Sequence, residues 1–531
     1  MKLKKLLSIF LVLVLATSLG ACGKSKNKKE EKVNVSQETK SKDGGTMVIG
    51  LDADPITLNP LYATDRVSFT INRALYDPLI IIDKEGTRNY LAEDIKLSQD
   101  GMTYTIKLKK NLKWHDGQAL TADDLIFTLD TILNENHKSK LRDKLIINEK
   151  PVEYSKIDET TIQIKLPEIS IPFMNSIAQI YPIPKHIFEG ETDISISKKN
   201  ETPVGSGPFK FKEWKKGESV LLDNFKDYYN GKPHLDSVAF RIIPDPNTAK
   251  VALENGEVSV QYIATKEYEK YKKEDKFNVE AINEGMIDYM IFKFNSEPLN
   301  NKDVRYAISH ALNQEEIVKG SYDSIEYADK ANSILASNTL YYSDKVKPVE
   351  YNLDKAKELI KKAGYEKGLK LKLAYINSSK KQENSALIIQ QKLKDIGIEL
   401  EVIPMEKNSY IEKILDKNNK DFDICFNGYV MGIEPDSYKS VYKTGQQFNI
   451  SQYSDKDIDK KWDEASVEVD KEKREKLYHD IQTKVIEDAP IYPIAYPKLF
   501  VALDKKIKGL EEAKIVPIYI FEDFSKLYIS K

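Results

Sequence analysis

Hydrophobic and polar positions alternate with two different periods along most of the chain, most clearly in residues 369–403. Leucine at every second position of 369–373 predicts a strand. An apolar stripe at helical spacing in 386–396 predicts a helix that ends at Gly397, and the two-residue alternation then returns in 398–402. A strand, a helix and a strand in this order form a βαβ unit with parallel strands, so the pattern predicts an α/β protein.

Three further apolar stripes predict helices that face a core. The first begins after Asn352, a good N-cap residue, and ends at Gly364. The others cover residues 304–312 and 477–485. The first strand-like run begins at Thr46, and strands and helices alternate after it. A chain of 531 residues is long enough for more than one domain.

The first 45 residues follow neither period. Residues 24–45 are mostly Lys, Glu, Ser, Asn and Gly, a composition that cannot bury enough surface to order itself and predicts a flexible tether over 22–45. Before it, a basic start and an apolar run from Leu6 to Leu19 are too short for a membrane helix, which needs ~20 residues. The following Gly20-Ala21-Cys22 resembles a bacterial lipoprotein signal, and an ordinary signal peptide with a chance cysteine is the alternative.

This resemblance implies a signal peptide over 1–21 and lipidation of Cys22, with palmitate among the expected acyl groups. The rest of the chain would then be lipid-anchored on the extracytoplasmic face of the bacterial cell membrane. The only other cysteine, Cys425, lies in an apolar run and is expected to be a small buried hydrophobe. No intramolecular disulfide is then possible.

Net charge and motifs narrow the classes of function. The formal net charge is -2 and basic residues do not form a phosphate-tracking stripe, so no nucleic acid is expected as partner. None of the six histidines belongs to a His-Glu-x-x-His pair, and no Gly-x-Ser-x-Gly elbow, phosphate-binding loop or Cys-x-x-Cys occurs. The pair His115-Asp116 resembles part of a metal-phosphohydrolase motif, but it is isolated. We therefore expect no enzyme, no cofactor and no metal site.

Residues 101–127 resemble the signature of the family 5 extracellular solute-binding proteins, the peptide- and nickel-binding receptors of ABC importers. Further matches follow in the family's order: Pro-Val-Gly-Ser-Gly-Pro-Phe at 203–209, Asp-Tyr-Tyr-Asn-Gly-Lys-Pro at 227–233, and segments 303–307 and 355–365. The resemblance covers residues 46–531 and is greatest to the oligopeptide-binding lipoproteins.

The resemblance implies a type II periplasmic-binding-protein-like fold, with two lobes and an additional inserted domain. Domain I would be discontinuous, comprising 46–82, 203–294 and 499–531. Domain II would be the insertion 83–202, and domain III would cover 295–498. The ligand would lie between domains I and III, with hinges near Asn295 and Tyr496.

The resemblance also implies two walls of a ligand cleft. The wall from domain III would consist of a strand and the loop after it: Asn427, Gly428, Tyr429, Val430, Met431, Gly432, Glu434 and Asp436. The opposite wall would include Asp54 and Tyr62, with Asn295 and Tyr496 at the hinges. Many family members carry an aspartate after the wall strand that pairs with the peptide's α-amino group, whereas Met431 or Gly432 stands there in this chain. Glu434 and Asp436 could instead be solvated acids in a turn.

The function implied is a monomeric, lipid-anchored receptor that captures oligopeptides and delivers them to the permease subunits of an ABC importer. An extended peptide held along its main chain would suit a receptor for many sequences. With the same fold, a nickel or metal chelate, a sugar or a signalling peptide remain alternatives. Bare nickel would need histidine ligands, and no histidine lies in the wall segments. A surface adhesin and a hydrolase are the alternatives of another class.

Overall fold

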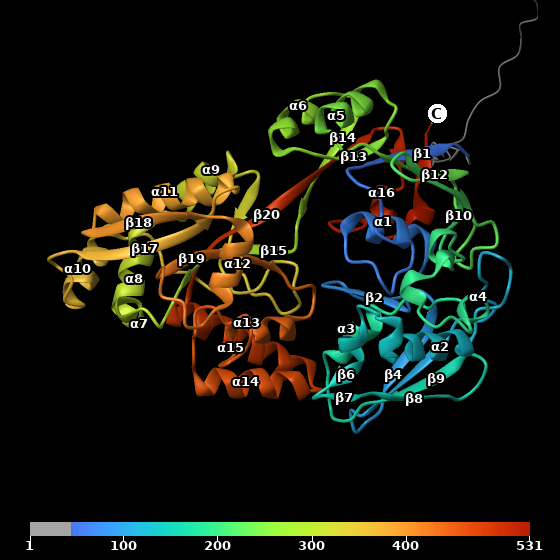
Figure 1. Ribbon diagram of the computed structural model, residues 1–531, viewed down its shortest axis with the longest axis horizontal. Coiled ribbons are helices and arrows are strands. Elements are labelled where there is room, and N and C mark those ends of the chain that lie inside the picture. Colours follow the sequence, from blue (N-terminus) through green and yellow to red (C-terminus); the bar gives the residue numbers. More distant parts are fainter. Residues whose placement is uncertain (1–43, 531) are drawn as a thin grey trace, which may run out of the picture. The chain divides into compact units, whose positions relative to one another are not determined.

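The computed structural model describes residues 44–530, in which a 12-stranded sheet runs through most of the chain. The signal peptide, Cys22 and the tether up to residue 43 lie outside the described residues. The strand β20 (Ile491–Asp504) joins the two parts of this sheet, as Figure 1 shows. No helix within residues 44–530 is both long and apolar enough to cross a membrane.

One part of the sheet contains the N-terminal strand. Its strands are β10 (Phe209–Lys215), β11 (Ser219–Asn224), β12 (Ser237–Ile242), β1 (Thr46–Leu51), β13 (Val260–Ile263) and β14 (Phe277–Asn283). Its helices are α1 (Arg66–Leu75), α5 (Pro246–Asn255), α6 (Tyr268–Lys272) and α16 (Leu510–Ala513). Two short pairs, β21 (Ile507–Lys508) with β24 (Tyr528–Ile529) and β22 (Ile515–Val516) with β23 (Ile520–Phe521), complete it.

The segment between β1 and β10 forms separate, smaller sheets. These are the hairpin β2 (Ile80–Asp83) and β3 (Gly86–Asn89), the pair β6 (Ile146–Ile147) and β7 (Lys150–Pro151), and a four-stranded sheet of β4 (Ala92–Leu97), β5 (Thr103–Leu108), β9 (Thr161–Lys165) and β8 (Glu153–Lys156). Its helices are α2 (Ala122–Leu133), α3 (Phe173–Ala178) and α4 (Lys185–Phe188). One hydrophobic core runs from residue 47 through these sheets to residue 527.

The other part of the large sheet contains the predicted βαβ unit. Its strands are β15 (Met286–Phe292), β16 (Ala328–Lys330), β17 (Leu369–Ile376), β18 (Ile398–Met405) and β19 (Ile424–Val430). β17 and β18 pair in parallel with Leu369 opposite Ile398, and α11 (Lys380–Lys394) connects them, so the βαβ prediction is confirmed.

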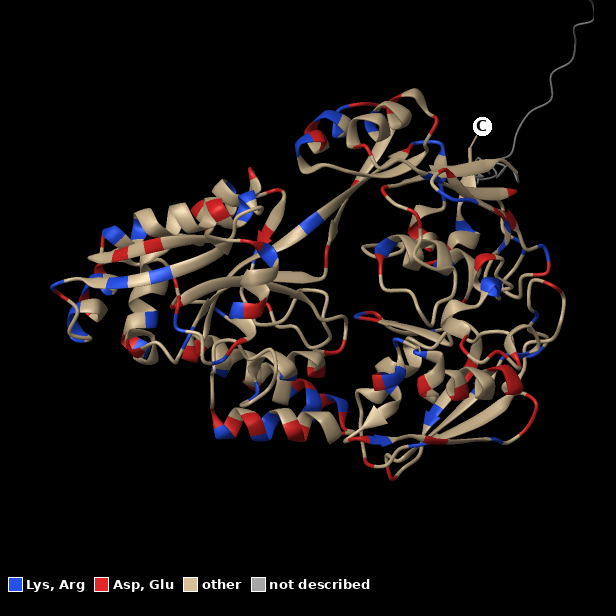
Figure 2. Ribbon diagram, in the orientation of Figure 1, with Lys and Arg blue, Asp and Glu red and all other residues tan. Residues whose placement is uncertain are grey.

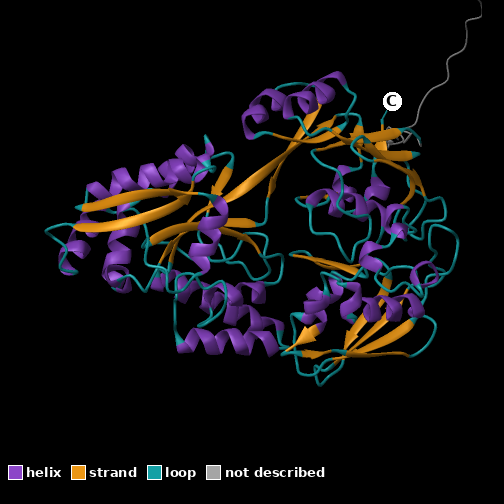
Figure 3. Cartoon of the chain, viewed as in Figure 1, coloured by secondary structure: helices purple, strands orange, loops and turns teal. Residues whose placement is uncertain are grey.

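Helices cover both faces of this part, as Figure 3 shows. One core includes side chains of α8 (Lys302–Ala311), α9 (Gln314–Tyr322), α10 (Leu353–Lys362) and α11, near the short α7 (Glu297–Asn300). The other core includes side chains of α12 (Lys407–Leu415), α13 (Lys439–Tyr442), α14 (Lys456–Val467) and α15 (Lys471–Asp488). β15 alternates between them, with Met290 in the first core and Tyr289 in the second, because successive strand side chains point to opposite faces.

The structure confirms the predicted helices and one predicted burial. Asn352 caps α10 by accepting a hydrogen bond from the Lys355 amide (2.9 Å), and the stripes at 304–312 and 477–485 fall in α8 and α15. Cys425 is fully buried, and burial raises the pKa of its thiol to about 12.

Two segments cross between the parts of the large sheet. The first is the turn between β14 and β15, and the second is β20, whose Ile491–Ala495 stretch pairs with β15 and whose Phe500–Leu503 stretch pairs with β13. The second crossing lies close to Tyr496. The first lies before Met286, so β15 belongs to the part of the sheet that contains β19. Asn295, which follows β15, therefore lies beyond this crossing.

Candidate ligand-binding site

A cavity of about 570 Å³ lies where segments far apart in the sequence meet. Pro60, Ala63 and Thr64 line it from the loop after β1, and Phe69, Asn72 and Arg73 line it from α1. Segments 140–144 and 175–181 contribute from the region of the small sheets, and residues 430–433 with Ser437 contribute from the loop after β19. The volume falls within the roughly 300–1,000 Å³ typical of ligand sites.

The first wall of the cavity is α1. Asp65 begins this helix by accepting a hydrogen bond from the Ser68 amide (2.8 Å). Asn72 lines the cavity, is 3% exposed, and neither its amide nitrogen nor its amide oxygen has a partner in the structure. A buried polar group without a partner costs about 1–3 kcal/mol. Asn72 is therefore a group that a bound ligand or water would satisfy.

Arg73, the next residue of α1, is only partly satisfied. Its Nη1 donates to Asp77 (2.8 Å), and the Tyr228 and Tyr229 hydroxyls donate to the same carboxylate (2.6 and 2.8 Å). Burial alone would lower the pKa of Arg73, but the Asp77 carboxylate, together with neighbouring tyrosines, more than offsets this and raises it. Nε and Nη2 of Arg73 are buried without a partner, and the Tyr90 ring lies 4.6 Å from its guanidinium carbon.

The opposite wall is the loop after β19. Val430, Met431 and Gly432, three of the residues expected from the sequence, line the cavity together with Ile433. Gly432 has φ +77, a left-handed conformation that glycine adopts readily, and no neighbouring atom lies within 4 Å of where its Cβ would stand.

Glu434 lies in the same loop, but its carboxylate pairs with a residue outside the cavity. Its carboxylate pairs with Arg474 of α15 (2.6 Å), with side-chain exposures of 7% and 5%, so it is not a solvated acid. Asp436 accepts hydrogen bonds from the Ser466 hydroxyl (2.6 Å) and the Tyr478 hydroxyl (3.3 Å). Neither carboxylate lines the cavity, because both hold the loop against α14 and α15.

The structure places Asn427, Gly428 and Tyr429 of the wall strand β19 outside this cavity, whereas Val430, the last residue of the strand, lines it. Asn427 lines a second, smaller pocket. A Cβ on Gly428 would stand 2.5 Å from an oxygen of Asp288, so glycine permits the close pairing of β19 with β15. The ring of Tyr429 packs against Phe448 with centroids 5.7 Å apart.

The four other predicted site residues do not line the cavity either. Asp54 accepts a hydrogen bond from the Trp214 indole (3.1 Å), and Asn295 donates to the backbone oxygen of Lys417 (3.0 Å). The buried hydroxyl of Tyr496 donates to the Leu335 oxygen (3.1 Å). Tyr62 lies beside the cavity-lining Ala63 but is itself 7% exposed, and its hydroxyl has no partner.

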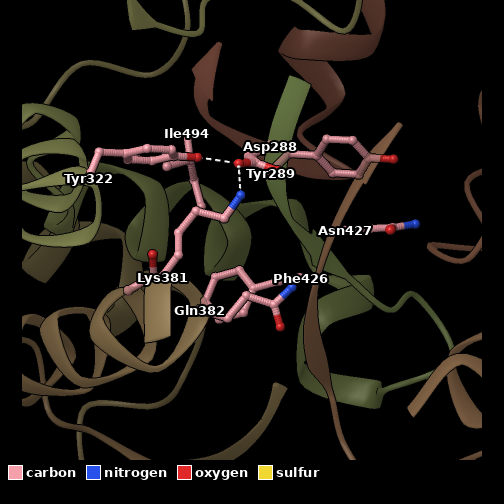
Figure 4. Close-up of a pocket in the computed structure, with 9 residues that line it drawn as sticks. Asp288, Tyr289, Tyr322, Lys381, Gln382, Phe426, Asn427 and Ile494 are labelled. Atoms are coloured by element: carbon pink, nitrogen blue, oxygen red, sulfur yellow. Dashed lines mark hydrogen bonds and ion pairs between the residues drawn. The ribbon is translucent and has the colours of Figure 1, made fainter. Parts of the chain in front are cut away.

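Figure 4 shows the second pocket, which lies beside the first crossing. Asp288 of β15 accepts hydrogen bonds from the Tyr322 hydroxyl and the Lys381 ammonium group. The pocket holds about 20 Å³, room for about one water molecule. This cluster ties α9 and α11 to the sheet, and the pocket is too small for a peptide.

The charged residues that sequence reasoning missed are all cations. Arg73, Lys140 and Lys144 line the cavity, whereas no aspartate or glutamate of the described chain does. Over the described chain as a whole, Figure 2 shows basic and acidic residues interspersed. The backbone of Lys140 donates to the Leu61 oxygen (3.1 Å), which fixes its segment beside the first wall. No local sequence pattern marks these positions, because only the fold brings them together.

A mixed α/β fold with two chain crossings and a cavity between them is the architecture of extracytoplasmic solute-binding receptors. The family described as bacterial extracellular solute-binding proteins, family 5, matches residues 87–452, more than half of the chain. The chain therefore belongs to the family 5 solute-binding proteins, which have a type II fold with several domains. Members of this family are transport receptors, not enzymes.

Individual relatives agree with this membership. The oligopeptide-binding protein AppA of Bacillus subtilis is 32% identical over 95% of both chains. The crystal structure of CtaP, an ABC transporter substrate-binding protein of Listeria monocytogenes, is 43% identical with a TM-score of 0.86, over 92% of this chain and 100% of CtaP. The structure of B. subtilis AppA in complex with a nonapeptide is 29% identical with a TM-score of 0.70, over 93% and 100% of the two chains.

Proposed function

We propose that this protein captures oligopeptides in the cavity between α1 and the loop after β19 and delivers them to the permease of an ABC importer. The observation that carries the proposal is the position of the cavity, whose walls come from the two sides of the crossings formed by β14–β15 and β20. A relative named for oligopeptide binding, 32% identical, supports the ligand class.

A ligand that touches both walls would favour their approach, since a ligand shifts a conformational equilibrium only by its preference for one state. Hinged closure around a ligand needs few flexible connections, and the two crossings would supply them. Contacts already bridge the sides, and one of them is the hydrogen bond from the Ile171 amide to the Ser466 oxygen (3.0 Å). The Lys84 ammonium group, at the tip of the β2–β3 hairpin, donates to the Ser337 oxygen and lies 4.6 Å from the centre of the Tyr342 ring.

The proposal includes a three-domain organisation, a monomeric state and a lipid anchor on Cys22. The pattern of a basic start, an apolar run and a cysteine after small residues supports the anchor. The test is a Cys22→Ala precursor expressed in a bacterial host. We expect loss of acylation and release from the membrane fraction, and unchanged acylation would refute the anchor.

The ligand class is tested by native mass spectrometry and calorimetry on the full chain. A ladder of masses that corresponds to mixed peptides would support the proposal, as would heat of association with a synthetic nonapeptide pool. A single sugar or a metal chelate retained through purification would replace it. No binding of any peptide pool, with unchanged small-angle scattering, would refute it.

A further inference from the structure

We propose that the turn of residues 517–520 determines which peptides the cavity prefers, because it holds Tyr519 in an aromatic corner with Phe69 and Tyr181. The preferred ligands would be peptides that carry an aromatic side chain. This inference rests on the proposed function and adds to it a class of ligand and the residue that selects it. Three observations carry it: the strained backbone of the turn, the hydrogen bonds that fix the turn, and the rings that meet beside the cavity.

The backbone of this turn is strained at Ile520. The turn connects β22 to β23, and Val516 pairs with Ile520 across it. Ile520 has φ +64, a left-handed conformation in which three-residue hairpin loops normally place glycine and which β-branched residues very rarely adopt. Its side chain is fully buried in the core that runs from residue 47 to residue 527, so packing holds the backbone in this conformation. Strain of this kind persists where the surrounding structure over-determines it, and it is concentrated at functional sites.

Hydrogen bonds from two different elements fix the same turn. The Thr70 hydroxyl of α1 donates to the Ile518 oxygen (3.1 Å). The Tyr262 hydroxyl of β13 donates to the Pro517 oxygen (2.6 Å), and the proline ring itself restricts the backbone. Tyr519 is therefore held in place before a ligand arrives, which lowers the cost of ordering it on binding.

Three aromatic rings meet beside the cavity. Phe69 of α1 and Tyr519 both line it, with ring centroids 6.2 Å apart and ring planes at 87° to each other. Tyr181 also lines the cavity, and its hydroxyl and that of Tyr519 are hydrogen-bonded to each other. All three residues are half-buried, so they keep surface that a ligand can contact.

A corner of perpendicular rings suits a third ring. Aromatic rings prefer edge-to-face or offset-stacked contacts, and a ligand ring in the corner can make both at once. Met431 and Ile433 line the cavity from the loop after β19, so they offer apolar contact without this geometry. A favourable aromatic pair contributes the equivalent of about two- to tenfold in affinity beyond the area that it buries. An aromatic side chain should therefore be preferred over an aliphatic side chain of the same size.

The first experiment separates aromatic character from size. Nonapeptide pools that are otherwise identical and free of aromatic residues carry one phenylalanine, or one cyclohexylalanine, at each position in turn. Cyclohexylalanine has a ring of similar size but no π system. Affinities for the full chain are measured by calorimetry, and we expect the phenylalanine pool to bind about two- to tenfold more tightly.

The second experiment changes the corner. Tyr519→Leu should lower the affinity for the phenylalanine pool about two- to tenfold and should change that for the cyclohexylalanine pool less than about twofold. The matched control is Tyr306→Leu, at a half-buried tyrosine of α8 that does not line the cavity and whose ring centroid lies 6.0 Å from that of His310. This control should leave the preference for phenylalanine unchanged.

The third experiment tests the support of the turn. Thr70→Val with Tyr262→Phe removes both hydroxyls that donate to the turn and keeps the shape of both side chains. We expect the preference for phenylalanine to fall below about twofold, because Tyr519 is no longer held in the corner. Thr70→Ser, which keeps its hydroxyl, should retain the preference. The circular dichroism and unfolding midpoint of each variant establish that it is folded.

The outcomes separate this inference from the proposed function. Equal affinity of the unaltered protein for both pools overturns the aromatic preference while peptide capture stands. A preference that persists in Tyr519→Leu, or equal losses in Tyr519→Leu and Tyr306→Leu, overturns the role of Tyr519. An unchanged preference in Thr70→Val with Tyr262→Phe overturns the part assigned to these two hydroxyls. Failure of both pools to bind refutes peptide capture itself, and this inference with it.

Discussion

Removal of the charge on Glu434 should destabilise the region around α15 by about 3 kcal/mol or more. Its carboxylate pairs with Arg474 at 2.6 Å, and both side chains are almost fully buried. Burial alone would lower the pKa of Arg474, and the pairing with Glu434 more than offsets this. The guanidinium stays charged when Glu434 is replaced, because arginine has an ordinary pKa above about 12 and does not deprotonate in proteins. An uncompensated buried charge of this kind costs ~3–5 kcal/mol.

The surroundings of Arg474 explain why it cannot escape to solvent. Its Nε donates to the Ala465 oxygen (2.9 Å), and its guanidinium carbon lies 5.2 Å from the Tyr478 ring and 5.6 Å from the Tyr341 ring. Glu434→Gln keeps the shape and removes only the charge. The double variant Glu434→Gln, Arg474→Met removes both charges, so it should recover at least about 1 kcal/mol relative to the single variant.

The assay uses a local fluorescent probe. The chain has three tryptophans, and Trp462 packs on Tyr478 with ring centroids 5.8 Å apart. In a background with the other two replaced by phenylalanine, urea unfolding followed by Trp462 emission reports this region. The control is Glu399→Gln, which breaks a pair with Lys370 at 3.0 Å whose side chains are 72% and 82% exposed and should cost less than about 1 kcal/mol. A loss for Glu434→Gln no larger than this control would refute the reasoning.

Three further predictions concern other parts of the chain. Burial lowers the pKa of His115 to about 4, below its ordinary value of about 6.5, so the unfolded state binds a proton before the folded state does. The contribution of His115 to the free energy of unfolding should therefore be constant above pH 6.5 and fall by up to about 3 kcal/mol towards pH 4. A His115→Asn variant with the same pH profile would contradict this assignment. Cys425, fully buried with its pKa raised to about 12, should react with a thiol reagent only in urea, and rapid labelling of the native protein would disprove its burial. Lys84→Ala should speed peptide release several-fold in stopped-flow measurements, because it removes a contact between the two sides of the crossings, and an unchanged release rate would show that this contact plays no part in closure.

The elements of the fold could be predicted because their causes are local. The alternation that predicts β17, α11 and β18 is visible in neighbouring residues of the sequence. The Asn352 cap depends only on the helix that follows it. The two-sided burial of β15 also follows from its apolar run over residues 289–292. The exact crossing points depend on which strands pair, and pairing over long separations leaves no local pattern.

The site could be predicted only in part, for the same reason. Val430, Met431 and Gly432 line the cavity because resemblance identifies a whole segment, whose place in the fold is inherited. Glu434 and Arg474 lie far apart in the sequence, so their pairing could not be anticipated from either neighbourhood. Asn72 looks like an ordinary polar position of an amphipathic helix until tertiary structure shows that nothing pairs with it.

The family's most recognisable motifs act on the scaffold rather than on the ligand. The His115 imidazole accepts a hydrogen bond from the Gly205 amide and donates to the Gly207 oxygen, each at 3.0 Å. A Cβ on Gly205 would stand 2.0 Å from the Leu75 oxygen, so this glycine lets the motif pack directly against the end of α1. The two motifs thus hold the end of α1, whose last turns carry Asn72 beside the cavity. A receptor's ligand is therefore better inferred from the charges and unpaired groups that line its cavity than from the signature that identifies its family.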